Sequence, residues 1–116
     1  MSKTEKDSIR DNIKRASVEI LLLALLNDGD KYGYQMTQEL KKRTDCKIVL
    51  LEGSMYPILY KLTEEGCVTY EERQAGRRRT RVYYHLTKKG RKKLEALIRD
   101  FREQINVVES LLSKVS

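Results

Sequence analysis

The apolar positions of this chain follow a helical period over most of its length and a strand period in one short region. From about Ser8 to Asn27, apolar residues recur every three or four positions, and Leu21 to Leu26 are apolar without interruption. We expect a helix whose last two turns are buried on all sides. Asp28-Gly29-Asp30 then supplies a glycine stop for this helix and a candidate N-cap, Asp30, for the next one.

A second helix is predicted over Lys31–Arg43, because Met36 and Leu40 stand one turn apart and would share its inner face. After this helix the period is lost over Asp45–Glu52. The apolar run Ile48 to Leu51 inside that segment is either a short strand or an apolar anchor under the turn.

The pattern predicts a third helix that begins near Gly53 or Ser54 and ends at Gly66. Pro57 constrains the start of this helix, because proline has no backbone N–H and is tolerated only where that donor is not needed. The residues expected to face the core are Ile58, Leu59 and Leu62.

A strand period of two follows, over Cys67–Arg73 and again over Thr80–Thr87. The two segments are expected to form a hairpin with one core face and one wet, basic face. The predicted core face carries Val68, Tyr70, Val82, Tyr84 and Leu86.

The helical period returns after Thr87, a candidate N-cap, and continues to about Lys114, which predicts a helix of roughly 40 Å. Gly90 in its first turn suggests tight packing there. Its apolar stripe is wider than so small a domain can hide. The alternatives are packing on the chain's own first helix or, as we expect, pairing with a second copy. The expected dimer interface contains Leu94, Leu97, Ile98, Phe101, Ile105, Val108, Leu111 and Leu112.

Three helices, a hairpin and a long final helix, in that order, are typical of a winged helix-turn-helix with a C-terminal dimerisation helix. We therefore predict an α+β, mostly helical fold. Residues 8–87 would form the DNA-binding domain and residues 88–114 the dimerisation helix. With 116 residues, the chain is too short for a catalytic domain beside a separate binding domain.

Charge sharpens this picture, because the positive surplus of the chain is local. Ten of its 24 basic residues lie between Arg73 and Leu94, a stretch without any acidic residue. The other 14 face 17 acidic residues, so the net charge of +7 comes from one region. Arg77–Arg79 follow the turn residue Gly76 at the expected hairpin tip, where guanidinium groups suit phosphates or a narrow minor groove.

The third helix and the hairpin tip are therefore the expected DNA-contacting elements. Two less specific interpretations remain: Tyr56 and Tyr60 packing as a pair against the second helix, and a basic run that is only solvated. Tyr32 and Tyr34 either support the turn before the second helix or contact DNA. The candidate DNA-binding residues are Tyr34, Ser54, Tyr56, Tyr60, Lys61, Arg77, Arg78, Arg79 and Arg81.

The residues give no support to catalysis or to a metal site. His85 is the single histidine, and Cys46 and Cys67 lack metal-ligand spacing, so we expect reduced thiols, no metal and no cofactor. No nucleophile stands near a recognisable base, so we expect no enzymatic activity. The longest apolar run, Ile20 to Leu26, is too short to cross a membrane, and we expect a soluble, cytoplasmic protein.

Four motifs in order and spacing resemble the signature of the PadR family of bacterial transcriptional regulators, over about residues 16 to 90. They are Tyr32-Gly33-Tyr34-Gln35-Met36, then Gly53-Ser54-Met55-Tyr56-Pro57-Ile58-Leu59, then Lys61-Leu62-Thr63-Glu64-Glu65-Gly66, and finally Gly76-Arg77 with Tyr83-Tyr84-His85-Leu86-Thr87-Lys88-Lys89-Gly90. The single C-terminal helix resembles the shorter subfamily.

The resemblance implies a homodimeric repressor that binds a palindromic operator in double-stranded DNA and releases it when a small molecule or another signal arrives. A hydrophobic effector would enter between the long helices and the first helix, near Ile13, Ile98, Phe101 and Ile105. Many family members carry a tryptophan near the wing or in the last helix, and this chain has none. The rival interpretation is a winged-helix module whose basic face binds an acidic protein partner.

Overall fold

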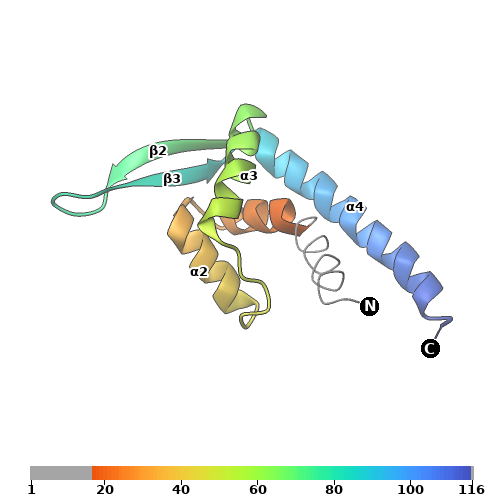
Figure 1. Cartoon of the computed structure of the whole chain (residues 1–116). Coiled ribbons are helices and arrows are strands. Elements are labelled where there is room, and N and C mark those ends of the chain that lie inside the picture. Colours follow the sequence, from red (N-terminus) through yellow and green to blue (C-terminus); the bar gives the residue numbers. More distant parts are fainter. Residues whose placement is uncertain (1–16, 116) are drawn as a thin grey trace.

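A computed structural model describes residues 17–115, and their elements follow the predicted order (Figure 1). A helix over residues 17–27 is followed by β1 (Lys31–Tyr32), α2 (Gly33–Arg43), α3 (Glu52–Glu64), β2 (Val68–Gln74), β3 (Thr80–Leu86) and α4 (Lys88–Leu112). The predicted α+β winged-helix architecture is confirmed. The beginning of the first predicted helix, including Ile13, lies outside the described residues.

The core lies where the helix over 17–27 meets α2, α3, the base of the hairpin and the first half of α4. The leucine run of the first helix is buried as predicted, with Leu22 and Leu23 fully inaccessible. Each buried side chain of this size contributes about 1.5–3 kcal/mol through removal of apolar surface from water. The other fully buried side chains are Met36, Met55, Leu59, Leu62, Cys67 and Val68.

The second helix begins two residues later than predicted. Lys31 and Tyr32 form β1 instead, which pairs antiparallel with β3 in a three-stranded sheet of order β1-β3-β2. The expected N-cap, Asp30, is therefore wrong; Tyr32 takes that position and its N–H donates to the Gln35 side chain at 3.3 Å. The extra strand satisfies backbone groups along an edge of β3 that would otherwise stay unpaired.

The segment between α2 and α3 contains no strand. Leu50 is buried and Ile48 packs on the core, whereas Leu51 is exposed. The interpretation as an apolar anchor is therefore correct, and the strand alternative is wrong.

The third helix starts at Glu52 and is closed by Gly66, whose positive φ of 77° matches the predicted glycine stop. Pro57, however, is the sixth residue of α3 and lies inside the helix rather than in its first turn. Because proline has no N–H, it cannot donate to the carbonyl of Gly53, four residues earlier.

The hairpin of β2 and β3 projects away from the helices (Figure 1). Its inner face is buried only at the base, where Val68 lies opposite Leu86. The predicted core face is wrong for Tyr70 and Val82, which are 61% and 37% exposed. The strands continue past the helices, so no described element covers these side chains.

The start of α4 is fixed by a cap and by close packing. Thr87 is the predicted N-cap: its hydroxyl oxygen accepts from Gly90 N–H at 3.0 Å, and its O–H donates to the Gly66 carbonyl at 2.7 Å. A Cβ at Gly90 would overlap the carbonyl oxygen of Cys67, so the predicted tight packing is confirmed. Leu94, four residues on, is the last fully covered residue of α4.

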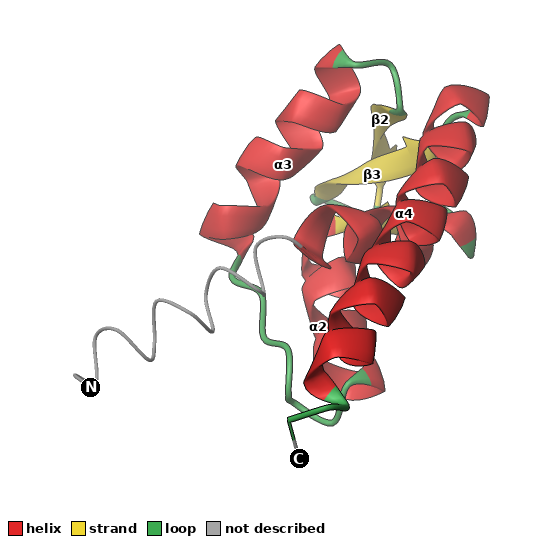
Figure 2. Cartoon of the chain, turned by 90° about the vertical axis from the view of Figure 1, so that its right-hand side faces the viewer, coloured by secondary structure: helices red, strands yellow, loops and turns green. Residues whose placement is uncertain are grey.

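Beyond Ile98, α4 leaves the body of the molecule, and every residue from 99 to 115 is exposed. Figure 2 views the chain from the side to which this helix projects. The radius of gyration is 16.5 Å, against about 13 Å for a compact domain of this size. No helix among the described residues is long and apolar enough to cross a membrane.

Candidate nucleic-acid interface

The face of α3 opposite the core is exposed along its whole length. Met55, Leu59 and Leu62 point inward, so the residues half a turn away must face solvent. All four candidates on this helix are exposed, and so are Gly53 and Pro57 on the same face. The outward residues are Gly53, Ser54, Tyr56, Pro57, Tyr60 and Lys61.

The side chain of Tyr56 is partly packed against α2 and partly exposed to solvent. Its hydroxyl end lies against the first residue of α2, because a Cβ at Gly33 would overlap that oxygen. Burial, and then the carboxylate of Glu52, raise the pKa of Tyr56. The side chain nevertheless remains 42% exposed, so packing against the second helix accounts for only part of it. Tyr60 is 67% exposed, so the two tyrosines do not pack as a pair against α2.

The arginines of the hairpin tip are exposed and have no carboxylate partner in the part of the chain that the structure describes. Gly76 turns the chain with φ of 149°, and the Ala75 N–H donates to the Arg79 carbonyl at 2.8 Å across the turn. Within residues 17–115, none of the ion pairs involves the three tip arginines. The tip therefore presents three uncompensated positive charges, at Arg77, Arg78 and Arg79.

Arg81 is held nearer the body of the molecule. Its guanidinium lies 4.3 Å from the centre of the Tyr32 ring, and that ring packs edge-on against Tyr83 at 5.4 Å. A cation over an aromatic face keeps its charge while its orientation is restricted. Arg81 is thus an oriented cation at the root of the wing.

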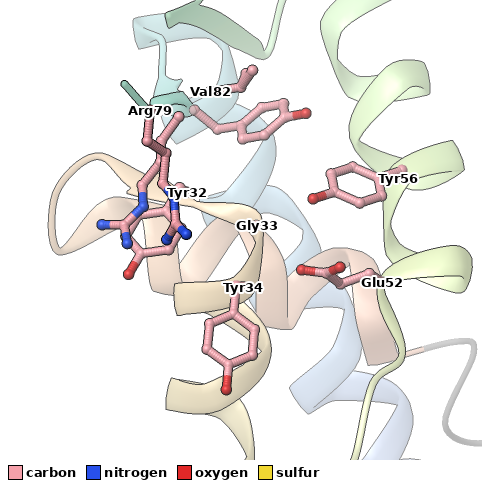
Figure 3. Close-up of a pocket in the computed structure, with 9 residues that line it drawn as sticks. Tyr32, Gly33, Tyr34, Glu52, Tyr56, Arg79 and Val82 are labelled. Atoms are coloured by element: carbon pink, nitrogen blue, oxygen red, sulfur yellow. The ribbon is translucent and has the colours of Figure 1, made fainter. Parts of the chain in front are cut away.

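An open cleft of about 490 Å³ joins the wing to the two helices. Figure 3 shows Arg79 on one side of it, with Glu52 and Tyr56 on the other and Tyr34 below. The cleft brings together four predicted residues from three elements: Tyr34, Tyr56, Arg79 and Arg81. Glu52 also lines it. No sequence pattern points to this carboxylate, because most of its neighbours in the cleft come from distant segments.

Two cations of the basic stretch are neutralised within the chain. Arg73 contacts Asp30 and Glu71, each at 2.6 Å, and these hydrogen bonds raise its pKa. Burial disfavours the charge on Lys93, but its contacts with Glu19 and Glu65, both 2.6 Å, outweigh this and raise its pKa. The basic surface therefore has fewer unpaired cations than the ten basic residues counted in the sequence, and it is centred on the hairpin tip.

His85 belongs to the same network on the wet face of the sheet. Its Nδ1 lies 2.7 Å from an Asp30 oxygen, and the hydrogen bonds from His85 and Arg73 lower the pKa of Asp30. Asp30 is 55 positions from His85 in the sequence. Local sequence patterns cannot reveal such a pair, and for Asp30 they indicate a helix N-cap instead.

The predicted dimer and effector residues fall into two groups. Leu94 is buried in the core of its own chain, and Leu97 and Ile98 are packed against that core. The others are exposed, so no described part of the chain covers them: Phe101, Ile105, Val108, Leu111 and Leu112. A shallow hollow on α4 includes Ile98 but is lined mainly by charged side chains, and it includes neither Phe101 nor Ile105.

Comparison with known proteins gives one family match, which covers residues 22–96: the transcriptional regulator PadR-like family. Two solved structures share the fold at 24% identity. A transcriptional regulator from Clostridium thermocellum matches over 85% of this chain and 96% of its own length, with a TM-score of 0.80. A PadR family regulator from Eggerthella lenta matches over 94% and 93%, with a TM-score of 0.82.

A third solved structure is PadR from Bacillus subtilis in complex with operator DNA. It is 29% identical to this chain and has a TM-score of 0.64. The match covers 69% of this chain and 45% of that protein, so more than half of that protein lies outside the match.

Proposed function

Because the chain belongs to the PadR-like family of transcriptional regulators, we propose that it is a repressor that binds a palindromic DNA operator as a homodimer. Its family and its structural neighbours are transcriptional regulators, not enzymes. The operator complex of the Bacillus subtilis protein supports DNA as the ligand. The observation that carries the proposal is the group of unpaired wing arginines beside the exposed face of α3.

In this proposal α3 enters the major groove with its N-terminal half, and the wing contacts the backbone. Ser54, Tyr60 and Lys61 lie on the exposed face and would meet base edges or nearby phosphates. The tip arginines would bind phosphates or a narrow minor groove without reading sequence in detail. Tyr34, Tyr56 and Arg81 line the cleft between these elements, so they would position the wing and the DNA backbone.

The homodimer would form through the exposed apolar stripe of α4. A contiguous stripe of this kind on an isolated helix is unfavourable in water, and a second copy would bury it. Two recognition helices about 34 Å apart would then read successive major grooves, which explains the expected palindrome. A signal that changes the angle between the two α4 helices would change that spacing and release the operator.

A small-molecule effector is the proposed source of this signal. Ile98, Phe101 and Ile105 lie on the part of α4 that a second subunit would meet, so a concave apolar site would require both subunits. Ile13, the fourth residue of the expected site, lies outside the described residues.

The test starts with selection of bound fragments from genomic DNA, followed by affinity measurements on the selected operator and on a random duplex. Tyr60→Ala and Lys61→Ala, on the reading face, are expected to cost about 1–3 kcal/mol on the operator and little on random DNA. Equal losses on both duplexes would mean that α3 does not read sequence. Absence of any selected fragment, with binding instead to acidic proteins, would favour the rival interpretation.

A further inference from the structure

The fold explains why five of the six positions occupied by glycine require that residue. Nothing within residues 17–115 requires glycine at position 53. Three adopt positive φ angles, which glycine tolerates best: Gly29, Gly66 and Gly76. Two lie where a Cβ would overlap a neighbour: Gly33 against Tyr56, and Gly90 against Cys67. Gly53 has no positive φ, and no atom within the described part of the chain lies within 4 Å of the position of its missing Cβ.

A glycine in this position weakens the helix that contains it. Gly53 is the second residue of α3 and is exposed, so close packing within residues 17–115 does not favour glycine there. Alanine would fit the same backbone and would hold it in the helical conformation more strongly. Contacts within residues 17–115 therefore do not explain the absence of a side chain, which leaves room for a partner to approach the helix closely at this point.

Gly53 lies on the midline of the exposed face of α3, in the first turn of the helix. Pro57 follows one turn later and Tyr60 about two turns later, so the three residues form one row opposite the buried Met55 and Leu62. The first half of this row has no long side chain. N-terminal residues of a recognition helix are those that contact base edges in the major groove.

Pro57 adds a second, chemical feature to this bare surface. In a regular helix the N–H of residue 57 would donate to the carbonyl of residue 53, and proline cannot do so. The Gly53 carbonyl thus lacks its regular intrahelical donor and keeps acceptor capacity. The exocyclic amino groups of cytosine and adenine are the hydrogen-bond donors that bases present in the major groove.

We propose that Gly53 is the point of closest approach between α3 and DNA, and that its carbonyl accepts a hydrogen bond from a base amino group. The inference rests on the proposed function, and it assigns sequence discrimination to a residue without a side chain. A side chain at position 53 would hold the whole helix further from the groove and weaken every other base contact.

The experiment uses the full-length protein with Gly53→Ala, Gly53→Ser and Gly53→Leu. Alanine and leucine favour helices over glycine, so their melting temperatures are expected to rise by a few degrees. Operator affinity is expected to fall as the side chain grows, by roughly tenfold for alanine, since 1.4 kcal/mol corresponds to a factor of ten. Affinity for a random duplex should change less than twofold.

Gln38→Ala is the matched control, because it raises helix propensity at an exposed position of α2 without adding bulk to α3. It should leave operator affinity unchanged. Pro57→Ala tests the carbonyl, since it restores the missing donor; it should reduce discrimination among single-base-pair operator variants at one position.

The possible outcomes separate the inference from the function beneath it. If the wild type binds no operator, the proposed function is wrong and the inference fails with it. If the wild type binds and Gly53→Ala binds equally well, only the inference is wrong. A Gly53→Ala protein that loses its dimer in light scattering would show that position 53 meets another subunit, which also overturns it.

Discussion

At the scale of single residues, charge matters only where it is left uncompensated. Ten basic residues lie between Arg73 and Leu94. The structure pairs Arg73 with Asp30 and with Glu71 of its own strand, and it pairs Lys93 with Glu19 and Glu65. Which cations stay free depends mainly on contacts between distant segments, so the sequence could locate the basic patch but not the cations in it that remain unpaired. Asp30 illustrates the same limit, since its partners Arg73 and His85 lie on the hairpin.

The Asp30 network predicts a pH-dependent contribution to stability. The pKa of Asp30 is lowered in the folded chain, so the contribution is present above the unfolded value of about 3.9 and is lost as pH falls through the folded value. Asp30→Asn should remove it, at a cost below about 1 kcal/mol near neutral pH because the site is largely exposed. The difference between the melting temperatures of the two proteins should therefore begin to shrink as the pH falls below about 4 and vanish below the folded pKa of Asp30. A constant difference across this range would contradict the assignment.

At the scale of elements, the order of helices and the hairpin could be predicted because each has a clear hydrophobic period. The errors came from tertiary contacts. β1 contains only two residues and forms because β3 has an edge with which it can pair. Tyr70 and Val82 are exposed because the strands extend beyond the helices. For the site, exposure of the α3 face followed from its helical period, whereas the cleft with Glu52 required the packed fold.

Lys93 joins three elements, because it lies in α4 and contacts Glu19 of the first helix and Glu65 at the end of α3. Lys93→Met should destabilise the fold by about 1–3 kcal/mol, since it leaves two partly buried carboxylates close together without their nearest cation; Glu19 keeps only a 3.9 Å contact with Lys61. Adding Glu19→Gln should recover part of this loss. Denaturant unfolding of the single and double variants measures both effects; full additivity of the two substitutions would contradict the network.

At the scale of the whole molecule, the wing and α4 extend in different directions from one small core (Figure 1). This division separates DNA contact from subunit contact, so one function can be disrupted while the other elements stay folded. Leu94 anchors α4 to the core, and the exposed residues beyond Ile98 are free to meet a second subunit.

Phe101→Asp should produce a folded monomer. Phe101 is 39% exposed and lies outside the core, so its replacement should spare the domain, whereas a charge in the centre of the α4 pairing should prevent association. Light scattering and thermal melting measure these outcomes. Lys92→Asp, an exposed change in the first half of the same helix, is the control and should stay dimeric. A Phe101→Asp dimer of unchanged stability would contradict the proposed interface.

The central claim is that the free wing arginines bind DNA phosphates, and the salt dependence of two arginine variants tests it most directly. Arg78→Ala should weaken binding to operator and random duplex alike. It should also reduce the slope of log affinity against log salt by roughly one to two, because each wing of a dimer loses a contact worth about 0.9. Arg73→Ala, at a cation already paired with Asp30 and Glu71, should leave the slope nearly unchanged. Equal slopes for the wild type and Arg78→Ala would contradict the account.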